Sequence, residues 1–221
     1  MNIDGVFIDF LGHSGFLIKV GNKRIAIDPY NVNRSLEKVD IILITHPHQD
    51  HCSIKDIDQL SKPNTTIIVP ADCQSKVMKI KDINLKLITL GKKLDLDEII
   101  IETFPAYNIN KPFHEKSESW LGYIIHIGKT IIYHAGDTDK IPEFSSLSKY
   151  SEKNKFIAIL PVSREFAMTA EEAADAASII NPSIAIPMHY GAGVAGTQTD
   201  AERFVELCSN KGINARVLNK L

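Results

Sequence analysis

The sequence is poor in cysteine, and the few cysteines it has do not form a disulfide framework. Only three of the 221 residues are cysteine, namely Cys52, Cys73 and Cys208, and they are far apart with no CxxC pair. Small folds held together by disulfides carry an even and much denser set of cysteines. We therefore expect free thiols and a reducing, cytoplasmic environment.

Long hydrophobic runs are also missing. No apolar run approaches the roughly 20 residues that span a bilayer, and the acidic start Met1–Phe10 does not resemble a signal peptide. Hydrophobic residues make up 44% of the chain and charged residues 24%, which are ordinary globular values. We expect no membrane partner and, without a repeat or linker to divide the chain, one domain over residues 1–221.

The chain has no surplus of positive charge. It contains 25 Lys and Arg residues against 27 Asp and Glu residues, which gives a net charge of −2. General nucleic-acid binders carry an excess of basic residues gathered on one face. The composition therefore argues against a general nucleic-acid binder, and it leaves oligomerisation open.

Short runs rich in β-branched residues recur along the chain and predict strands. These runs span residues 6–10, 16–20, 24–27, 41–45, 66–69, 85–90, 99–104, 122–127, 130–133, 156–160 and 183–187. Gly21-Asn22 and Gly128-Lys129 predict hairpin turns. Ile41–Ile44 is apolar throughout, which is typical of a strand covered on both faces.

Helical signals are fewer. Thr169 with Glu172, and Thr199 with Glu202, are capping-box patterns that predict two helices, the second ending near Gly212. Weaker helices are expected after Ser53 and through Cys73–Ile80. The polar stretch 108–119 is the longest irregular segment, and loops of this length are often functional. Many strands with separate helices indicate an α+β domain.

Four metal-ligand side chains fall within six residues just after a buried strand. They are His46, His48, Asp50 and His51. In an extended backbone, His46 and His48 point to the same side, and Asp50 and His51 are offset by the turn. Imidazole and carboxylate together suit zinc and other first-row ions. The alternative, a solvated polar loop, fits so dense a cluster poorly.

Further ligands must come from elsewhere in the chain, and three candidates follow strands or lie in loops. They are His114, Asp137 and His189. Judged alone, each has a simpler interpretation: a solvated loop histidine, a turn residue and a packing residue, respectively.

Taken together, these motifs resemble the metallo-β-lactamase superfamily over nearly the whole chain. Residues 45–51 look like its HxHxDH signature, and Leu11–Gly15 with Ile27–Pro29 is similar to the opening of one branch. That branch includes ascorbate-6-phosphate lactonase-like proteins and the phospholipase D that acts on N-acylphosphatidylethanolamine. Its later motifs match Trp120–Tyr123, Gly136–Thr138 and Pro187–Gly191.

The resemblance implies a four-layer αββα sandwich and a site for two divalent ions, zinc above all, with manganese, nickel or iron as alternatives. It implies that His46, His48 and His114 hold one ion, that Asp50, His51 and His189 hold the other, and that Asp137 bridges them. Asp28 would brace the ligand loop. His134 would support Asp137, or simply pack in the interior.

The implied reaction is hydrolysis of an ester-type bond, a lactone or a phosphodiester, by metal-activated water that Asp50 orients. A small anionic substrate is expected, with His13, Asn108, Arg164 and Tyr190 as candidate contacts. His13 could instead close a turn, and Arg164, where many relatives carry glycine, could be a solvated loop residue. A redox iron protein of the same fold and a non-enzymic metal-binding protein are the alternatives.

Overall fold

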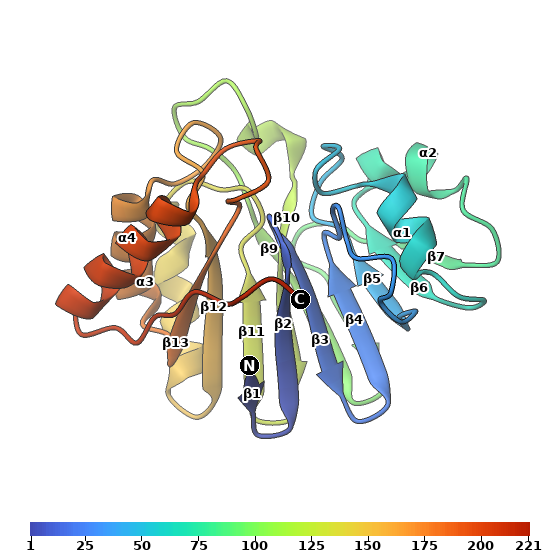
Figure 1. Cartoon of the computed structure of the whole chain (residues 1–221), viewed down its shortest axis with the longest axis horizontal. Helices are drawn as coiled ribbons and strands as arrows, with labels where there is room; N and C mark the ends of the chain where they lie inside the picture. The colour runs from blue at the N-terminus through green and yellow to red at the C-terminus, as the bar shows by residue number, and fades with distance from the viewer. The chain divides into compact units, whose positions relative to one another are not determined.

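The computed structural model describes all residues, 1–221, and the chain divides into two compact units. The first unit comprises Met1–Thr89 with Asn219–Leu221, and the second comprises Leu90–Leu218. Each unit contains one β-sheet with its own helices, so each can be followed separately (Figure 1).

The first unit has a seven-stranded sheet in the order β1-β2-β3-β4-β5-β6-β7. Its strands are β1 (Asn2–Ile3), β2 (Val6–Gly12), β3 (Gly15–Val20), β4 (Lys23–Ile27), β5 (Ile41–Leu43), β6 (Thr66–Val69) and β7 (Asn84–Leu87). Strands β1 to β4 pair antiparallel, and β4 to β7 pair parallel. The predicted turn Gly21-Asn22 is confirmed, since Val20 pairs with Lys23. Strand β5 is buried along its length, as its apolar sequence predicts.

Two helices accompany this sheet beside β5, β6 and β7 (Figure 1). They are α1 (Ile54–Leu60) and α2 (Gln74–Val77), and the 3₁₀ turn η1 (Ala71–Cys73) precedes α2. Ile57, Leu60 and Val77 pack with Ile42 and Ile67 in one buried apolar cluster. The prediction of a helix over Cys73–Ile80 was wrong in extent, because only one turn of α-helix forms there.

The second unit has a six-stranded sheet in the order β13-β12-β11-β10-β9-β8. Its strands are β8 (Lys93–Leu96), β9 (Ile99–Pro105), β10 (Leu121–Ile127), β11 (Thr130–His134), β12 (Lys155–Pro161) and β13 (Ile184–Met188). The predicted turn Gly128-Lys129 is confirmed by the pairing of Ile127 with Thr130. The edge strand β8 was not predicted, because its Lys-Leu-Asp-Leu sequence is short and charged.

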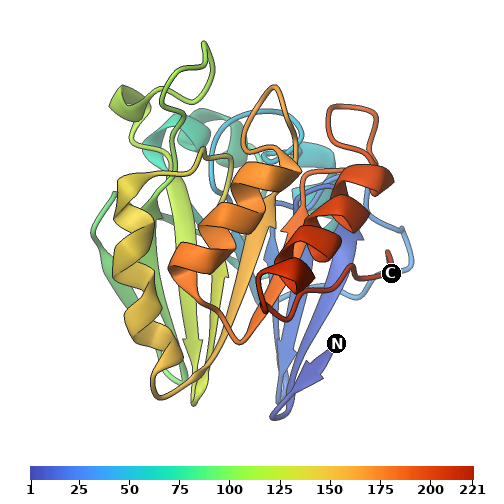
Figure 2. The same ribbon diagram turned by 90° about the vertical axis from the view of Figure 1, so that its left-hand side faces the viewer.

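The helical segments of the second unit are η2 (Lys116–Glu118), η3 (Pro142–Ser151), α3 (Ala170–Ile180) and α4 (Gln198–Asn210). Figure 2 shows η3, α3 and α4 side by side on one face of the sheet. The predicted capping box of α3 is confirmed: Thr169 Oγ1 accepts from the Glu172 amide at 3.2 Å. The cap of α4 was predicted two residues too late, since Thr197 and Asp200 form the box and Thr199 lies inside the helix.

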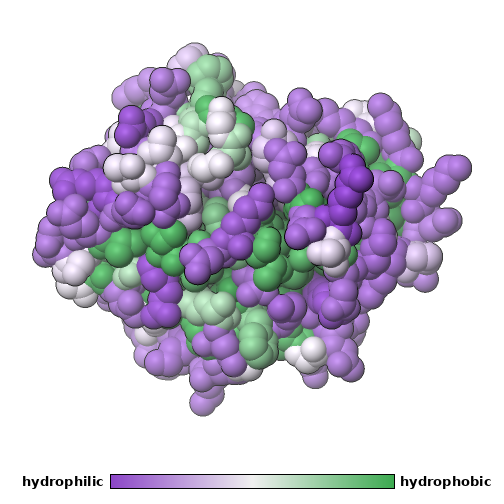
Figure 3. Space-filling view, viewed as in Figure 1, coloured by the Kyte–Doolittle hydropathy of each residue, from purple (hydrophilic) through white to green (hydrophobic).

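The interior is apolar and the surface mainly polar. One face of the protein is covered largely by hydrophilic side chains with scattered apolar patches (Figure 3). All three cysteines are buried free thiols. None of the helices has the length and apolar character that crossing a bilayer requires.

Candidate metal centre

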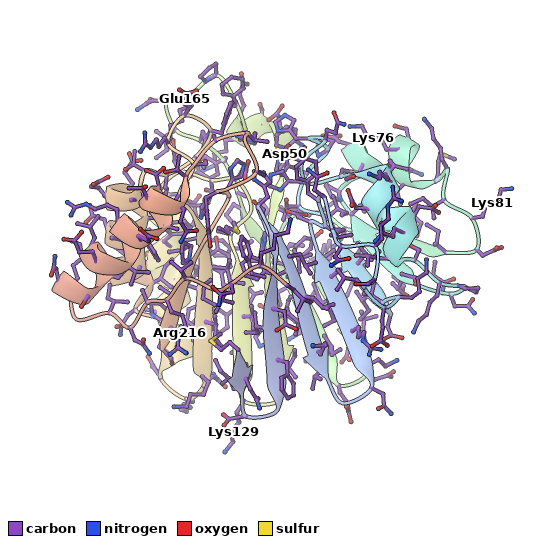
Figure 4. All side chains as sticks on the ribbon, viewed as in Figure 1. Asp50, Lys76, Lys81, Lys129, Glu165 and Arg216 are labelled. Carbon is purple, nitrogen blue, oxygen red and sulfur yellow. The ribbon has the colours of Figure 1, made fainter.

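The loop after β5 gathers the predicted ligands of the first unit. The amide of Ile44 still pairs with the Ile68 carbonyl at 3.0 Å, and the chain then turns so that the Cys52 amide donates to the His48 carbonyl at 2.7 Å. This turn brings the His46 and His51 ring centres within 4.0 Å. The side chain of Asp50 lies among other side chains at this loop, whereas that of Lys81 in the same unit projects outward (Figure 4).

The spacing of the ring nitrogens in this loop suits a shared ion. Nε2 of His46 lies 3.1 Å from Nδ1 of His48. Two nitrogens bound to one tetrahedral zinc ion at its usual bond length lie about 3.3 Å apart. His13, Asp50 and His51 form a neighbouring group, with ligand atoms within 4.8 Å of one another. The loop can therefore present two adjacent sets of donors.

Asp28 fixes the orientation of this loop through hydrogen bonds to Thr45 and His51. Its Oδ2 accepts from His51 Nδ1 at 2.7 Å, and both the amide and the hydroxyl of Thr45 donate to the same carboxylate. Because Asp28 accepts a hydrogen bond from Nδ1–H, Nε2 is the ring nitrogen of His51 that can bind a metal. Asp28 is fully buried and adopts a positive φ of 41°, and such strained residues concentrate at functional sites.

Thr45 extends the same effect to His46 and was missed by the sequence analysis. Its Oγ1 lies 2.6 Å from Asp28 and 2.9 Å from His46 Nδ1. Since the hydroxyl donates its one proton to the carboxylate, it accepts from His46 Nδ1–H. His46 is thereby left with Nε2 as its ligand atom. The signal was present in the sequence as a hydroxyl residue directly before the first histidine.

In the second unit, Asp137 lies between two predicted ligand histidines. Its Oδ2 is 3.3 Å from Nε2 of His114 and 3.0 Å from Nε2 of His189. All three side chains are buried, with at most 2% of each exposed. A carboxylate oxygen so close to two imidazole nitrogens has the placement that a bridging ligand needs.

The backbone of the second unit directs these side chains inward. His189 directly follows β13 and has a φ of 64°, and His114 has a φ of 57° in its loop. Gly196 closes the segment after His189, where a β-carbon would lie 2.3 Å from the His189 carbonyl oxygen. His134 accepts the Gly136 amide through Nδ1 at 3.3 Å. It therefore contacts the turn that carries Asp137, and its role in supporting that residue stays a prediction.

Asn108 organises the long polar loop. Its Nδ2 donates to the carbonyls of Phe113 at 2.9 Å and Phe166 at 2.8 Å, which uses both of its protons. The ring of Trp120 stands edge-on to His114 at 5.5 Å. The loop residue Lys111 is ion-paired with Asp139. This loop positions His114, and whether Asn108 also contacts a substrate stays a prediction.

Three further residues that were predicted to contact the substrate lie in different environments. Arg164 donates to Asp200 through Nε at 2.7 Å, although 60% of its side chain is exposed. Tyr190 is buried, and burial raises the pKa of its hydroxyl to about 12. His13 is buried in the first unit, with Nε2 at 2.8 Å from Asp50 Oδ2. Their contact with a substrate is untested.

The donor set fits divalent first-row ions. Each unit offers buried imidazoles together with a carboxylate, and in the first unit Thr45 and Asp28 set the ligand nitrogens of His46 and His51. Mixed nitrogen and oxygen donors of this kind suit zinc, manganese, nickel or iron. The protein has the side chains that a metal centre needs.

Comparison with known proteins identifies the class. Residues 7–189 match the model of the β-lactamase superfamily domain, so the chain belongs to that superfamily. A UPF0173 metal-dependent hydrolase of Nanoarchaeum equitans is 31% identical over 218 residues, which cover 96% of each chain.

Solved structures agree with this assignment. A crystal structure from Parabacteroides distasonis is 31% identical, with a TM-score of 0.83, over 98% of this chain and 93% of that one. Igni18, a metallo hydrolase of Ignicoccus hospitalis, has a TM-score of 0.77 at 23% identity, over 97% of this chain and 95% of that one. The latter likeness bears on the fold alone.

These matches confirm the superfamily and the fold class that the sequence predicts. They support the broad function as well, a metal-dependent hydrolase. The single domain over residues 1–221 and the role of each site residue stay predictions.

Proposed function

We propose that the protein hydrolyses an ester-type bond, a lactone or a phosphodiester, at a dinuclear metal centre. The proposed ligands are His46, His48 and His114 for one ion, Asp50, His51 and His189 for the other, and Asp137 as the bridge. The observation that carries most weight is Asp137 Oδ2 within 3.3 Å of two imidazole Nε2 atoms. That one centre uses both units rests on the superfamily resemblance.

When bound, two divalent ions would activate a water molecule and polarise the bond under attack. The chain's own residues orient the reaction. Asp50, with 17% of its side chain exposed, is the carboxylate that holds the attacking water and accepts its proton. Asp28 and Thr45 keep the imidazoles of the first unit in the tautomers that bind metal.

The basic side chains of Lys111 and Arg164 give limited support for the expected anionic substrate. Lys111 is paired with Asp139, and Arg164 with Asp200, so neither offers an unbalanced positive charge. The side chain of Arg164 is nevertheless 60% exposed. We therefore propose that a negative charge on the substrate is met mainly by the metal ions themselves.

The test combines metal analysis with a hydrolysis screen. The purified protein is reconstituted with Zn²⁺, Mn²⁺, Ni²⁺ or Fe²⁺ and assayed against a γ-lactone, bis(p-nitrophenyl) phosphate and p-nitrophenyl phosphate. We expect turnover of the lactone or the diester that is lost on chelation. Full metal occupancy with no hydrolysis of any compound would contradict the proposal.

Two alternatives give different results in the same experiment. A redox iron protein would show iron absorption bands and oxygen consumption, with no hydrolysis. A non-enzymic metal-binding protein would bind ions and turn over nothing. The partly exposed side chain of Asp50 beside buried imidazoles favours the hydrolase, because a purely structural site would have no need of a solvent-accessible carboxylate.

A further inference from the structure

His13 is a buried histidine in a strained turn of the first unit, outside the predicted ligand set. Its side chain has no solvent exposure and its backbone φ is 56°, in the left-handed region. A non-glycine residue in this conformation is strained, and such strain persists where the surrounding structure enforces it. At His13, the positive φ is enforced by the residues that surround the turn.

Packing from several sides holds this turn in place. The register of β2 against β3 shifts between Phe10 and Gly12, and Gly12 has a φ of 104°. The C-terminal residues cover it, because the Leu221 amide donates to the Phe10 carbonyl at 2.8 Å. A β-carbon on Gly12 would lie only 3.0 Å from Cε of Lys220. The turn therefore has little freedom to move His13.

The His13 ring is directed at Asp50. Its Nε2 lies 2.8 Å from Asp50 Oδ2, and its ring centre is 5.6 Å from those of both Tyr30 and His51. An ionised carboxylate can only accept a hydrogen bond, so the proton of a neutral His13 lies on Nε2. The 2.8 Å separation is that of a hydrogen bond.

We propose that His13 is a positioning residue that holds one oxygen of Asp50 through Nε2–H and so fixes the carboxylate for its role with water. This inference rests on the proposed function. It replaces the expectation that His13 contacts the substrate, and it gives a reason for the strained turn. Loss of the hydrogen bond would remove one constraint on the Asp50 carboxylate without removing any ligand.

The first test locates the proton and requires no substrate. In protein with ¹⁵N-labelled histidine, a ¹H–¹⁵N spectrum should show His13 protonated at Nε2, with slow exchange that is lost in Asp50→Ala. A neutral His13 with its proton on Nδ1 would overturn the proposal. This outcome is independent of whether the chosen substrates are the right ones.

The second test separates positioning from metal ligation. His13→Ala should keep the wild-type metal content, while kcat falls about 10- to 100-fold, as for other residues that orient a site, and KM changes little. His13→Gln retains an N–H near the position of Nε2 and should recover part of kcat. His126→Gln, which removes a histidine paired with Glu102, is the control and should behave as wild type.

The outcomes are distinguishable from failure of the proposed function. No turnover by the metal-loaded wild type defeats the hydrolase proposal and leaves the NMR result to decide on His13. Wild-type turnover with an equal kcat in His13→Ala overturns the positioning role. Loss of bound metal in His13→Ala overturns it too, because His13 would then be a ligand.

Discussion

Asp28 Oδ2 accepts a hydrogen bond from His51 Nδ1 at 2.7 Å, with both side chains completely buried. One carboxylate thus determines which nitrogen of a predicted ligand faces the metal. The same oxygen accepts the Thr45 hydroxyl, which in turn contacts His46 Nδ1. The metal-binding geometry of the loop therefore depends on a residue that precedes it by 17 positions.

Asp28→Asn should weaken metal binding while leaving every ligand in place. The amide has no charge and only one acceptor oxygen. Its NH2 group must therefore face either the Thr45 amide at the Oδ1 position or the Thr45 hydroxyl and His51 Nδ1 at the Oδ2 position, so the three hydrogen bonds to Asp28 cannot all be kept. We expect metal affinity to fall about 10- to 100-fold, measured by competition with a chromophoric chelator. Asp58→Asn, an exposed change on α1, is the control. Equal metal affinity in both variants would show that Asp28 does not control metal binding.

Gly196→Ala should disturb His189, whereas Gly193→Ala should not. Both glycines have a positive φ, 71° and 74°, so both variants carry about 1–2 kcal/mol of backbone strain. Only at Gly196 would the new β-carbon lie 2.3 Å from the His189 carbonyl oxygen; Gly193 has open space. The clash should cost roughly a further 1–3 kcal/mol in urea unfolding.

Metal content separates a local effect from a global one in this pair. We expect Gly196→Ala to lose bound metal even where it remains folded, because the segment that carries His189 must shift. Gly193→Ala should retain the wild-type content. Equal metal loss in both variants would show that loop strain alone, and not the contact with His189, explains the effect.

The sequence contained most of the local structure and the chemistry of the ligands. Strands, two hairpin turns and the α3 cap follow from patterns of three to seven residues, which local side-chain chemistry decides. Strand β8 and the start of α4 depended on context: β8 is held by its pairing with β9, and the Thr197 cap by the turn at Gly196. The contact of Thr45 with Asp28 joins residues 17 positions apart, and that of His13 with Asp50 joins residues 37 positions apart, so no local pattern encodes them.

The cap of α4 should make stability depend on pH in acid. Burial by itself raises the pKa of Asp200, but hydrogen bonds from Thr197 and Arg164 outweigh it and leave the pKa below its ordinary 3.8. This carboxylate therefore stabilises the fold above the unfolded-state value, and the contribution is lost as the pH falls through the lowered pKa.

Asp200→Asn should remove that part of the pH dependence. We expect the free energy of unfolding, measured with urea at pH 7 and pH 3, to change less in this variant than in the wild type. Asp95→Asn, which alters an exposed carboxylate on β8, should retain the wild-type change. An unaltered dependence in Asp200→Asn would show that other groups control acid stability.

The proposed dinuclear centre is tested most directly by counting metal ions in wild-type protein and in Asp137→Asn after reconstitution with Zn²⁺. Asp137 carries the carboxylate between His114 and His189, so its neutralisation removes the bridge and keeps the shape. We predict two ions per chain in the wild type, and one or fewer in the variant, with loss of hydrolysis. Fewer than one ion in the wild type, or two ions retained in Asp137→Asn, would contradict the account.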